Sequence, residues 1–390
     1  MPNFRGFWTR KPTVLIFIDL SQDLDVILPL IKAINDNDFF SLKTYVSNQV
    51  IKESPRIKQS LKAHKIPYSR IRHRLLKLGL QPNLSNVDVL ITASETSAKP
   101  HRYTHLLTQR SNQRKILTYT LQHGWENIGL TYFDDVHSPD VIHFASQKIL
   151  IWGNLDSLLP EVLPETKSRC VSVGCPKEKE FISTTATLEI PYQRDYLISV
   201  FENLHWHRYS NYYREQFLQD LETTVREFPD TTFLVKPHHA GQWLTKRYKG
   251  QLPTADNLVI INPREPQWEP FTAPALISHS NGIITTPSTV ALDAANLERP
   301  VSVIGYDLNL PKYEPLPILH SLTDWLEFIQ QIRYPETRIN LSQKTSTFLD
   351  KSIVPGNAIE RIIELIKFDI DIKSNKKNGH KNANRKGNIS

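Results

Sequence analysis

A histidine and a glycine follow the apolar run at residues 116–121. The imidazole of His123 can accept a proton near neutral pH, and Gly124 permits a sharp turn after a strand. Ligands of open parallel sheets bind at the carboxyl ends of the strands. We therefore predict that His123 is a catalytic general base and that Gly124 forms the turn. The alternative is a histidine that only hydrogen bonds to backbone groups of the turn.

One cation and two imidazoles follow a second apolar run, at residues 232–235. Pro237 has no N–H to donate to a sheet, so the strand is expected to end there. Basic side chains at a strand end can neutralise the pyrophosphate of a departing nucleotide. We predict that Lys236 and His239 bind a nucleotide-linked donor and that His238 takes part in catalysis. The alternative is a solvated strand end.

A third segment carries hydroxyl groups at the expected start of a helix. Pro287 suits the first helical position, with Thr286 as the N-cap. Free amides and hydroxyls at such a start, including those of Ser288 and Thr289, can hold a phosphate. Asp293 lies one helical turn beyond Thr289 and could accept hydrogen bonds from sugar hydroxyls. We predict that these side chains bind the donor, the alternative being an ordinary capped helix.

A turn with a lysine follows the expected short strand at residues 171–173. Gly174 and Pro176 favour this turn, and Lys177 is a candidate phosphate contact. The two cysteines, Cys170 and Cys175, are too few for a zinc site or a disulfide framework. We therefore predict no metal site.

Several common cofactor motifs are absent from the sequence. It contains no G-x-G-x-x-G fingerprint and no P-loop, and only 13 of its 390 residues are glycine. These absences argue against a nicotinamide dehydrogenase and a P-loop ATPase. We expect no cofactor, because the nucleotide-linked compound would be a substrate.

Strands alternate with helices along most of the chain, which is typical of parallel sheets covered on both faces. The expected strands are residues 13–19, 42–46, 87–92, 116–121, 141–144, 149–152, 171–173, 196–200, 232–235, 258–261, 283–285 and 301–304. The expected helices include residues 24–34, 101–110, 212–228 and 289–297. A chain of this length exceeds one ordinary core. We predict two Rossmann-like domains, an acceptor-side domain at residues 1–180 and a donor domain at 190–350, followed by a helix at 355–370.

The positive charge of the chain is concentrated in its last residues. The formal net charge is +7, and residues 373–390 contain six lysines and arginines but no acidic residue. The rest of the chain is therefore nearly neutral, which argues against a nucleic-acid partner. A segment so polar cannot bury apolar surface, so we expect residues 373–390 to be a disordered basic tail.

Another basic stretch, residues 52–77, has nine lysines and arginines against one acid, with leucine and isoleucine interleaved. A basic amphipathic surface of this kind can bind anionic lipid headgroups, although a solvated helical face over a core is the alternative. No segment approaches the ~20 apolar residues of a membrane span. We expect a cytoplasmic protein that docks peripherally on the inner face of the membrane.

Taken in order along residues 118–313, these segments resemble the CDP-glycerol glycerophosphotransferase family, which builds cell-envelope polymers. The family has His-Gly after one strand, Gly-x-Pro-Arg after another, a basic residue with His-Pro after a third, and a Thr-Asp-Tyr-Ser-Ser helix start with an acid one turn on. The matching segments here are His123-Gly124, Gly174-Cys175-Pro176-Lys177, Lys236-Pro237-His238-His239, Thr285-Thr286-Pro287-Ser288-Thr289 with Asp293, and the closing Pro300-Val301, Tyr306-Asp307-Leu308 and Tyr313. The sequence departs from the family at Lys177, at Thr286-Pro287 and at His239.

The resemblance implies a GT-B fold, in which two Rossmann-like domains face each other across a cleft. It implies metal-independent transfer of a glycerophosphate or glycosyl group from a CDP-glycerol-like donor to a hydroxyl acceptor of a glycan or lipid-linked polymer. The same fold also serves other functions. The alternatives are a nucleotide-sugar-dependent glycosyltransferase of capsule or lipopolysaccharide assembly, a protein without catalysis that binds a glycan or a partner, and a non-hydrolysing sugar-nucleotide epimerase.

Overall fold

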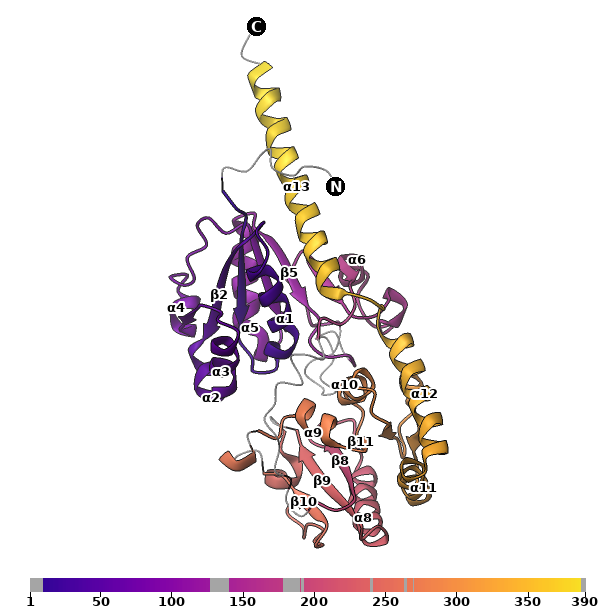
Figure 1. The fold of residues 1–390 in the computed structure, drawn as a ribbon. Helices are drawn as coiled ribbons and strands as arrows, with labels where there is room; N and C mark the ends of the chain where they lie inside the picture. Colours follow the sequence, from indigo (N-terminus) through magenta and orange to yellow (C-terminus); the bar gives the residue numbers. More distant parts are fainter. Residues whose placement is uncertain are drawn as a thin grey trace.

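The computed structural model describes residues 10–126, 140–177, 190, 193–238, 241–262, 265–268 and 270–386, with the backbone alone described from 377 to 386. Two parallel sheets, each covered by helices on both faces, lie one beyond the other (Figure 1). Sheet A has the strand order β3-β2-β1-β4-β5-β6-β7, and sheet B has the order β10-β9-β8-β11-β12-β13. The predicted fold class, two α/β domains with parallel sheets, is confirmed.

The first domain is built on sheet A. Its strands are β1 (Thr13–Ile18), β2 (Ser41–Ser47), β3 (Tyr68–Ile71), β4 (Val89–Ala93), β5 (Leu117–Leu121), β6 (Lys148–Ile151) and β7 (Cys170–Ser172). Its helices are α1 (Asp23–Asn35), α2 (Asn48–Glu53), α3 (Pro55–Ala63), α4 (His73–Lys77), α5 (Arg102–Gln113) and α6 (Pro164–Arg169), with short helices η1 (Lys99–His101) and η2 (Leu155–Ser157).

The central strand β1 is apolar from Val14 to Ile18 because it packs against helices on both faces. Ile16 belongs to the core that includes Ile27 of α1. Leu15 and Phe17 belong to a second core, which includes Leu107 of α5. Successive residues of a strand point to opposite faces, so a strand buried on both sides needs a continuous apolar run.

The second domain is built on sheet B. Its strands are β8 (Tyr196–Glu202), β9 (Thr231–Pro237), β10 (Leu258–Ile260), β11 (Gly282–Thr285), β12 (Val301–Ile304) and β13 (Ile318–Leu319). Its helices are α8 (Asn211–Glu227), α9 (Ala273–His279), α10 (Val290–Asn296), α11 (Leu322–Arg333) and α12 (Pro335–Ser352), with short helices η3 (Trp243–Arg247), η4 (Pro266–Trp268) and η5 (Pro311–Tyr313). Ile198 of β8 packs with Phe217 of α8, whereas Leu197 lies in the core that includes Ile277 of α9.

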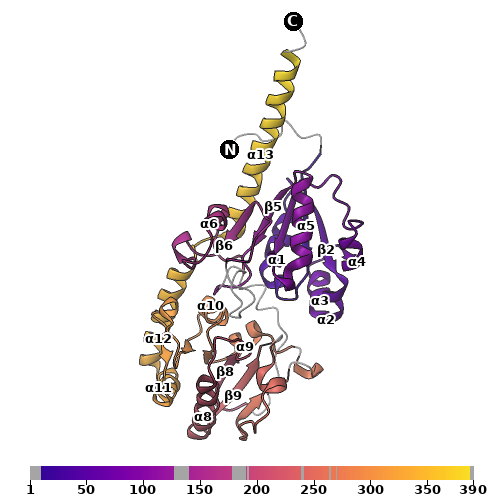
Figure 2. The ribbon, with the colours of Figure 1, turned by 180° about the vertical axis from the view of Figure 1, so that it is seen from behind.

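The chain returns to the first domain after α12. Helix α13 (Ala358–Lys386) contacts α1, and in both ribbon views it runs along sheet A and extends beyond it (Figures 1 and 2). Its buried residues Ile362, Ile366 and Ile370 join the core of the first domain. Within the described residues, no helix is long and apolar enough to cross a membrane.

Several predicted elements differ from the observed ones. Residues 141–144 form no strand, because Ile142 and Phe144 bury their side chains without ladder hydrogen bonds to a neighbouring strand. The edge strands β3 and β13 were not predicted. Helix α13 continues to Lys386, so most of the segment expected to be disordered is helical. The predicted domain boundary lies largely within residues 178–192, which are mostly outside the described residues.

Candidate active site

His123 lies just beyond β5 and is positioned by a hydrogen-bond chain from two other elements. The Ser94 hydroxyl follows β4, donates to Oδ1 of Asp23 at 2.6 Å, and hydrogen bonds to Nδ1 of His123. The Asp23 carboxylate at the start of α1 is fully buried, also accepts the backbone N–H of Leu20 at 3.0 Å, and lies 3.9 Å from Nδ1 of His123. Ser94 adopts a φ of 55°, a left-handed conformation that is uncommon for serine. We call this arrangement the Asp23–Ser94–His123 relay.

The relay determines which ring nitrogen of His123 can act as a base. The single hydroxyl proton of Ser94 goes to Asp23, so its oxygen accepts the Nδ1–H of the neutral imidazole. This tautomer leaves a lone pair on Nε2, and no described residue hydrogen bonds to that atom. The nearby Asp23 carboxylate would stabilise the imidazolium that forms when Nε2 takes a proton.

The turn that carries His123 is closed by Gln122. Its Nε2 donates to the carbonyl of Gly124 at 2.8 Å, and its Oε1 accepts the N–H of Trp152 at 2.7 Å. Gln122 is itself buried. The turn is therefore fixed by side-chain hydrogen bonds from within the first domain.

Lys236 is a partly buried cation at the end of β9. Within the described part of the chain, no hydrogen bond or ion pair reaches its ammonium group. Burial and, to a smaller extent, the charge of Arg56 from the first domain lower the pKa of Lys236 to about 8. Arg56 of α3 is paired with Asp25 of α1 at 3.2 Å. A desolvated cation next to a second cation, with no partner of its own, is the arrangement expected of an anion-binding site.

His238 is exposed and stacks on His205, with ring centroids 4.7 Å apart. Its Nδ1 accepts the N–H of Gly241 at 3.3 Å. His239, predicted to bind the donor, lies outside the described residues.

Two ionisable residues, one at the end of β8 and one just beyond it, were not predicted from the sequence. Burial raises the pKa of Glu202 to about 7, although its carboxylate accepts the N–H groups of Leu204 at 2.7 Å and Leu244 at 3.4 Å. Burial, together with His238 and nearby arginines, lowers the pKa of His205 to about 3. Ligands bind at the carboxyl ends of parallel strands, and Lys236 was chosen on this basis. The same reasoning applied to the strand at residues 196–202 would have selected Glu202.

Lys177 and Asp293 pair with each other across the two domains. The Lys177 ammonium donates to both carboxylate oxygens of Asp293, at 2.7 and 3.0 Å, and both side chains are mostly buried. Burial opposes the charge on Lys177, but Asp293, Cys175 and Asp25 together outweigh this effect and raise the lysine pKa. These two residues, both predicted to bind the nucleotide-linked donor, thus pair with each other in this structure.

The hydroxyl groups of the segment before α10 also have protein partners. Thr286 is buried and donates to Oδ1 of Asn203 at 2.7 Å, while the Ser288 hydroxyl lies 3.1 Å from that of Thr285 and accepts the N–H of Val290 at 3.2 Å. The helix begins at Val290, so the predicted N-cap at Thr286 and helix start at Pro287 are wrong. The cause is that the N–H of Thr286 still donates to Phe201 of β8 at 2.9 Å, which extends the sheet past β11.

The residues that follow His123 connect the domains directly. The N–H of Trp125 donates to the Thr289 hydroxyl at 2.8 Å, and the Lys312 ammonium donates to the Trp125 carbonyl at 3.0 Å. Next along the chain, Glu126 accepts a hydrogen bond from Arg208 at 2.7 Å. The segment that bears the candidate base is therefore held from both domains.

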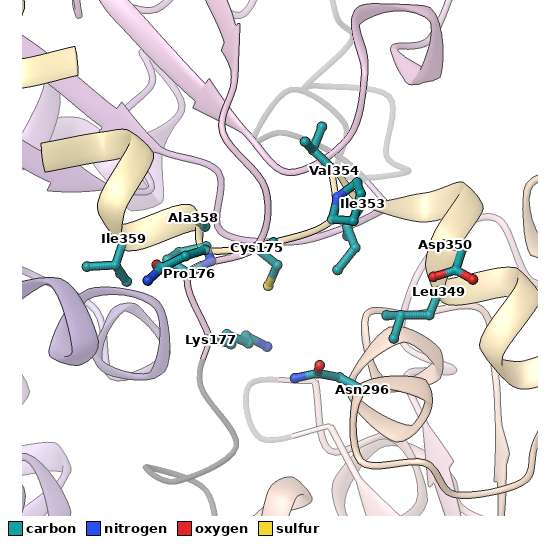
Figure 3. A pocket seen from close by; sticks show the side chains of 13 residues that line it. Cys175, Pro176, Lys177, Asn296, Leu349, Asp350, Ile353, Val354, Ala358 and Ile359 are labelled. Atoms are coloured by element: carbon teal, nitrogen blue, oxygen red, sulfur yellow. The ribbon is translucent and has the colours of Figure 1, made fainter. Parts of the chain in front are cut away.

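A cavity of about 380 Å³ lies where the chain passes between the domains. Figure 3 shows Lys177 and Asn296 beside this space, with the Cys175 thiol directed toward it. Its wall also includes residues 353–359, which connect α12 to α13. Gly174 nearby adopts a φ of 88°, and a Cβ there would lie 2.7 Å from the Val354 carbonyl, so only glycine fits this turn. The groups able to bind a metal do not form a cluster of three anywhere among the described residues.

No model of a protein family matches the sequence, and no curated protein is similar to it. Solved structures do share its fold. UDP-GlcNAc 2-epimerase from Neisseria meningitidis, bound to UDP-GlcNAc, superposes with a TM-score of 0.62 at 16% identity, covering 91% of this chain and 100% of that one. A glycosyltransferase from Rickettsia africae gives 0.54 at 12% identity, with 92% and 98% coverage. The wall teichoic acid polymerase TagF gives 0.57 at 12% identity, with 92% and 89% coverage.

At these identities the likeness concerns the fold, which is of the GT-B type over nearly the whole chain. The predicted resemblance is supported at this level, since TagF is among the structures of similar fold. Membership of the CDP-glycerol family remains a prediction.

Proposed function

We propose that this chain is a transferase that moves a glycosyl or glycerophosphate group from a nucleotide-activated donor to a hydroxyl acceptor. The observation that supports the proposal is the Asp23–Ser94–His123 relay, in which the Ser94 hydroxyl holds Nδ1 of His123 at the carboxyl end of β5 and no described residue hydrogen bonds to Nε2. In the second domain, Lys236 at the carboxyl end of β9 supplies a cation with which no described residue pairs. A base and a cation are the two groups that such a transfer needs.

In the proposed reaction, Nε2 of His123 accepts the proton of the acceptor hydroxyl. The hydroxyl oxygen forms a bond to the transferred carbon or phosphorus, while the bond from that atom to the nucleotide phosphate oxygen breaks. The departing nucleotide keeps the electron pair, and Lys236 with Arg56 neutralises its growing negative charge. Asp23 stabilises the imidazolium, and the proton returns to solvent after product release.

Two donor classes are proposed. The order of motifs favours CDP-glycerol or a related nucleotide-alditol, and the Asp23–Ser94–His123 relay is compatible with either class. The nucleotide-sugar alternative is supported by the shared fold with an epimerase bound to UDP-GlcNAc. The acceptor would be a hydroxyl of a glycan or a lipid-linked polymer.

The donor class can be identified by thermal shift with CDP-glycerol, CMP, UDP-GlcNAc, UDP and GDP-mannose. A ligand that prefers the native state raises its melting temperature, so one nucleotide class should stabilise the protein and the Lys236→Met variant should lose this response. The stabilising donor is then incubated with candidate acceptors, and the products are identified by mass spectrometry. A transferase yields an extended acceptor and free nucleotide. An isomerised donor would identify an epimerase, and no stabilisation by any nucleotide would contradict the proposal.

A further inference from the structure

Two leucines project from the first domain on a tight turn after α4. Leu78 is 64% exposed and Leu80 is 67% exposed. They are separated only by Gly79, whose φ of 75° makes the turn possible. We call residues 76–81 the leucine turn. Adjacent, strongly exposed leucines are unusual on a monomeric soluble surface and indicate an interaction site when polar groups surround them.

The leucine turn is held in place by hydrogen bonds. The guanidinium of Arg110 donates to the carbonyls of Leu76 and Gln81 at 3.1 Å and to that of Gly79 at 2.8 Å. The N–H of Leu80 donates to Leu75 at 2.9 Å. Because three carbonyls accept hydrogen bonds from one guanidinium, the backbone of the turn has a defined shape. The exposed leucines are therefore carried by an ordered segment. Such a surface is preorganised for binding.

Cations surround the leucine turn. Arg70, Arg72, Arg74 and Lys77 are exposed, and the described ion pairs include none of them. Exposed lysines also line α3, and α2, α3 and α4 lie together on one flank of sheet A in both views (Figures 1 and 2). Arg102, also exposed, lies over the ring of Tyr103 beside α4. This flank therefore combines two projecting apolar side chains with a dense positive charge.

We propose that the leucine turn and its surrounding cations dock the protein on an anionic phospholipid bilayer. The leucines would enter the boundary between headgroups and acyl chains, and the arginines would contact lipid phosphates. A nucleic acid offers phosphates but no apolar layer for the leucines. The inference goes beyond the proposed function, because it requires neither His123 nor a nucleotide.

Co-sedimentation with vesicles tests the proposal. The full chain should bind phosphatidylcholine–phosphatidylglycerol vesicles and bind pure phosphatidylcholine weakly. The L78S/L80S variant should lose about tenfold or more in affinity, because its apolar anchors are gone. The R72Q/R74Q variant should bind more weakly and with a smaller dependence on salt. Unchanged melting temperatures will show that both variants fold.

The matched control is Leu155→Ser. Leu155 is 49% exposed in η2, which contacts β7 at the opposite edge of sheet A from β3, so its replacement should leave vesicle binding unchanged. Equal vesicle binding by wild type and L78S/L80S would overturn the proposal, as would equal binding of the full chain to neutral and anionic vesicles. Light scattering supplies another check. If the full chain dimerises without binding vesicles and L78S/L80S is monomeric, the leucine turn is a self-association surface instead.

Discussion

The Lys236 ammonium is held at the end of β9 under conditions that disfavour its charge. It is partly buried, its pKa is lowered to about 8, and no described residue pairs with it. Burying an unpaired charge destabilises a fold. A residue kept in such a place is best explained by a ligand that supplies the missing negative charge.

Replacement of this lysine should therefore stabilise the empty protein. We expect Lys236→Met to raise the free energy of unfolding by about 1 kcal/mol or more at pH 7. The folded pKa of about 8 lies below the ordinary value of 10.5, so the penalty is present below pH 8 and disappears as the pH rises through this window. Chemical denaturation from pH 7 to pH 10 should show the advantage of the variant shrinking. A less stable variant at pH 7 would show that Lys236 has a structural role.

Lys177 and Asp293 present the opposite case, since each neutralises the other in a mostly buried pair. Lys177→Met should lower the free energy of unfolding by ~3–5 kcal/mol, because it leaves the Asp293 carboxylate buried without a partner. The K177M/D293L double variant should be more stable than K177M alone. Urea denaturation of the single and double variants measures the coupling. Additive losses would show that the two charges do not depend on each other.

At the scale of elements, α13 belongs to the second half of the sequence but stabilises the first domain. Its Asp369 accepts a hydrogen bond from Tyr119 of β5 at 2.6 Å and one from Lys148 of β6 at 2.8 Å. Ile366 and Ile370 are buried beside it. The helix therefore connects the end of the second domain to the central strands of the first.

Truncations should locate where this contribution ends. A chain that ends at Asn375 should keep the melting temperature of the full protein, because the last buried isoleucine, Ile370, is retained. A chain that ends at Glu364 loses Ile366 and Ile370, each worth ~2–5 kcal/mol, and should be destabilised by several kcal/mol. Differential scanning calorimetry of both chains provides the measurement. A large loss in the longer chain would assign a structural role to the basic end of the helix.

The central strands of both sheets were predictable because burial on two faces favours a nearly continuous run of apolar residues. Edge strand β3 was not, since Ser69 and Arg70 are exposed and leave little apolar signal. Residues 141–144 were predicted to form a strand but do not, because Ile142 and Phe144 are buried without a partner strand. The basic end of α13 is helical although its composition suggests disorder, because adding residues to an existing helix is easier than starting one.

The candidate site was predictable only in part. Examining the residues after each strand selected His123 and Lys236 as candidates. It could not reveal that Ser94 and Asp23 position His123, because these residues follow different elements and meet only in the folded sheet. Nor could it show that Thr289 bonds to Trp125, which requires both domains.

At the scale of the whole molecule, the two domains meet next to the candidate base. Trp125, two residues beyond His123, is held by Thr289 and Lys312 of the second domain. Binding of a donor to the second domain would therefore affect the position of Trp125, which is two residues from the candidate base His123. This arrangement is consistent with a reaction in which the donor and the proton acceptor come from different domains.

The turnover of the His123→Asn variant with the stabilising donor tests this account most directly, compared with wild type and with His143→Asn. His143 is exposed in the same domain and serves as the matched control. We expect His123→Asn to bind the donor as tightly as wild type by calorimetry but to turn over ~10²-fold more slowly, the usual scale for losing a general base. His143→Asn should behave as wild type. Near-normal turnover by folded His123→Asn would contradict the assignment of the base, and with it the central claim.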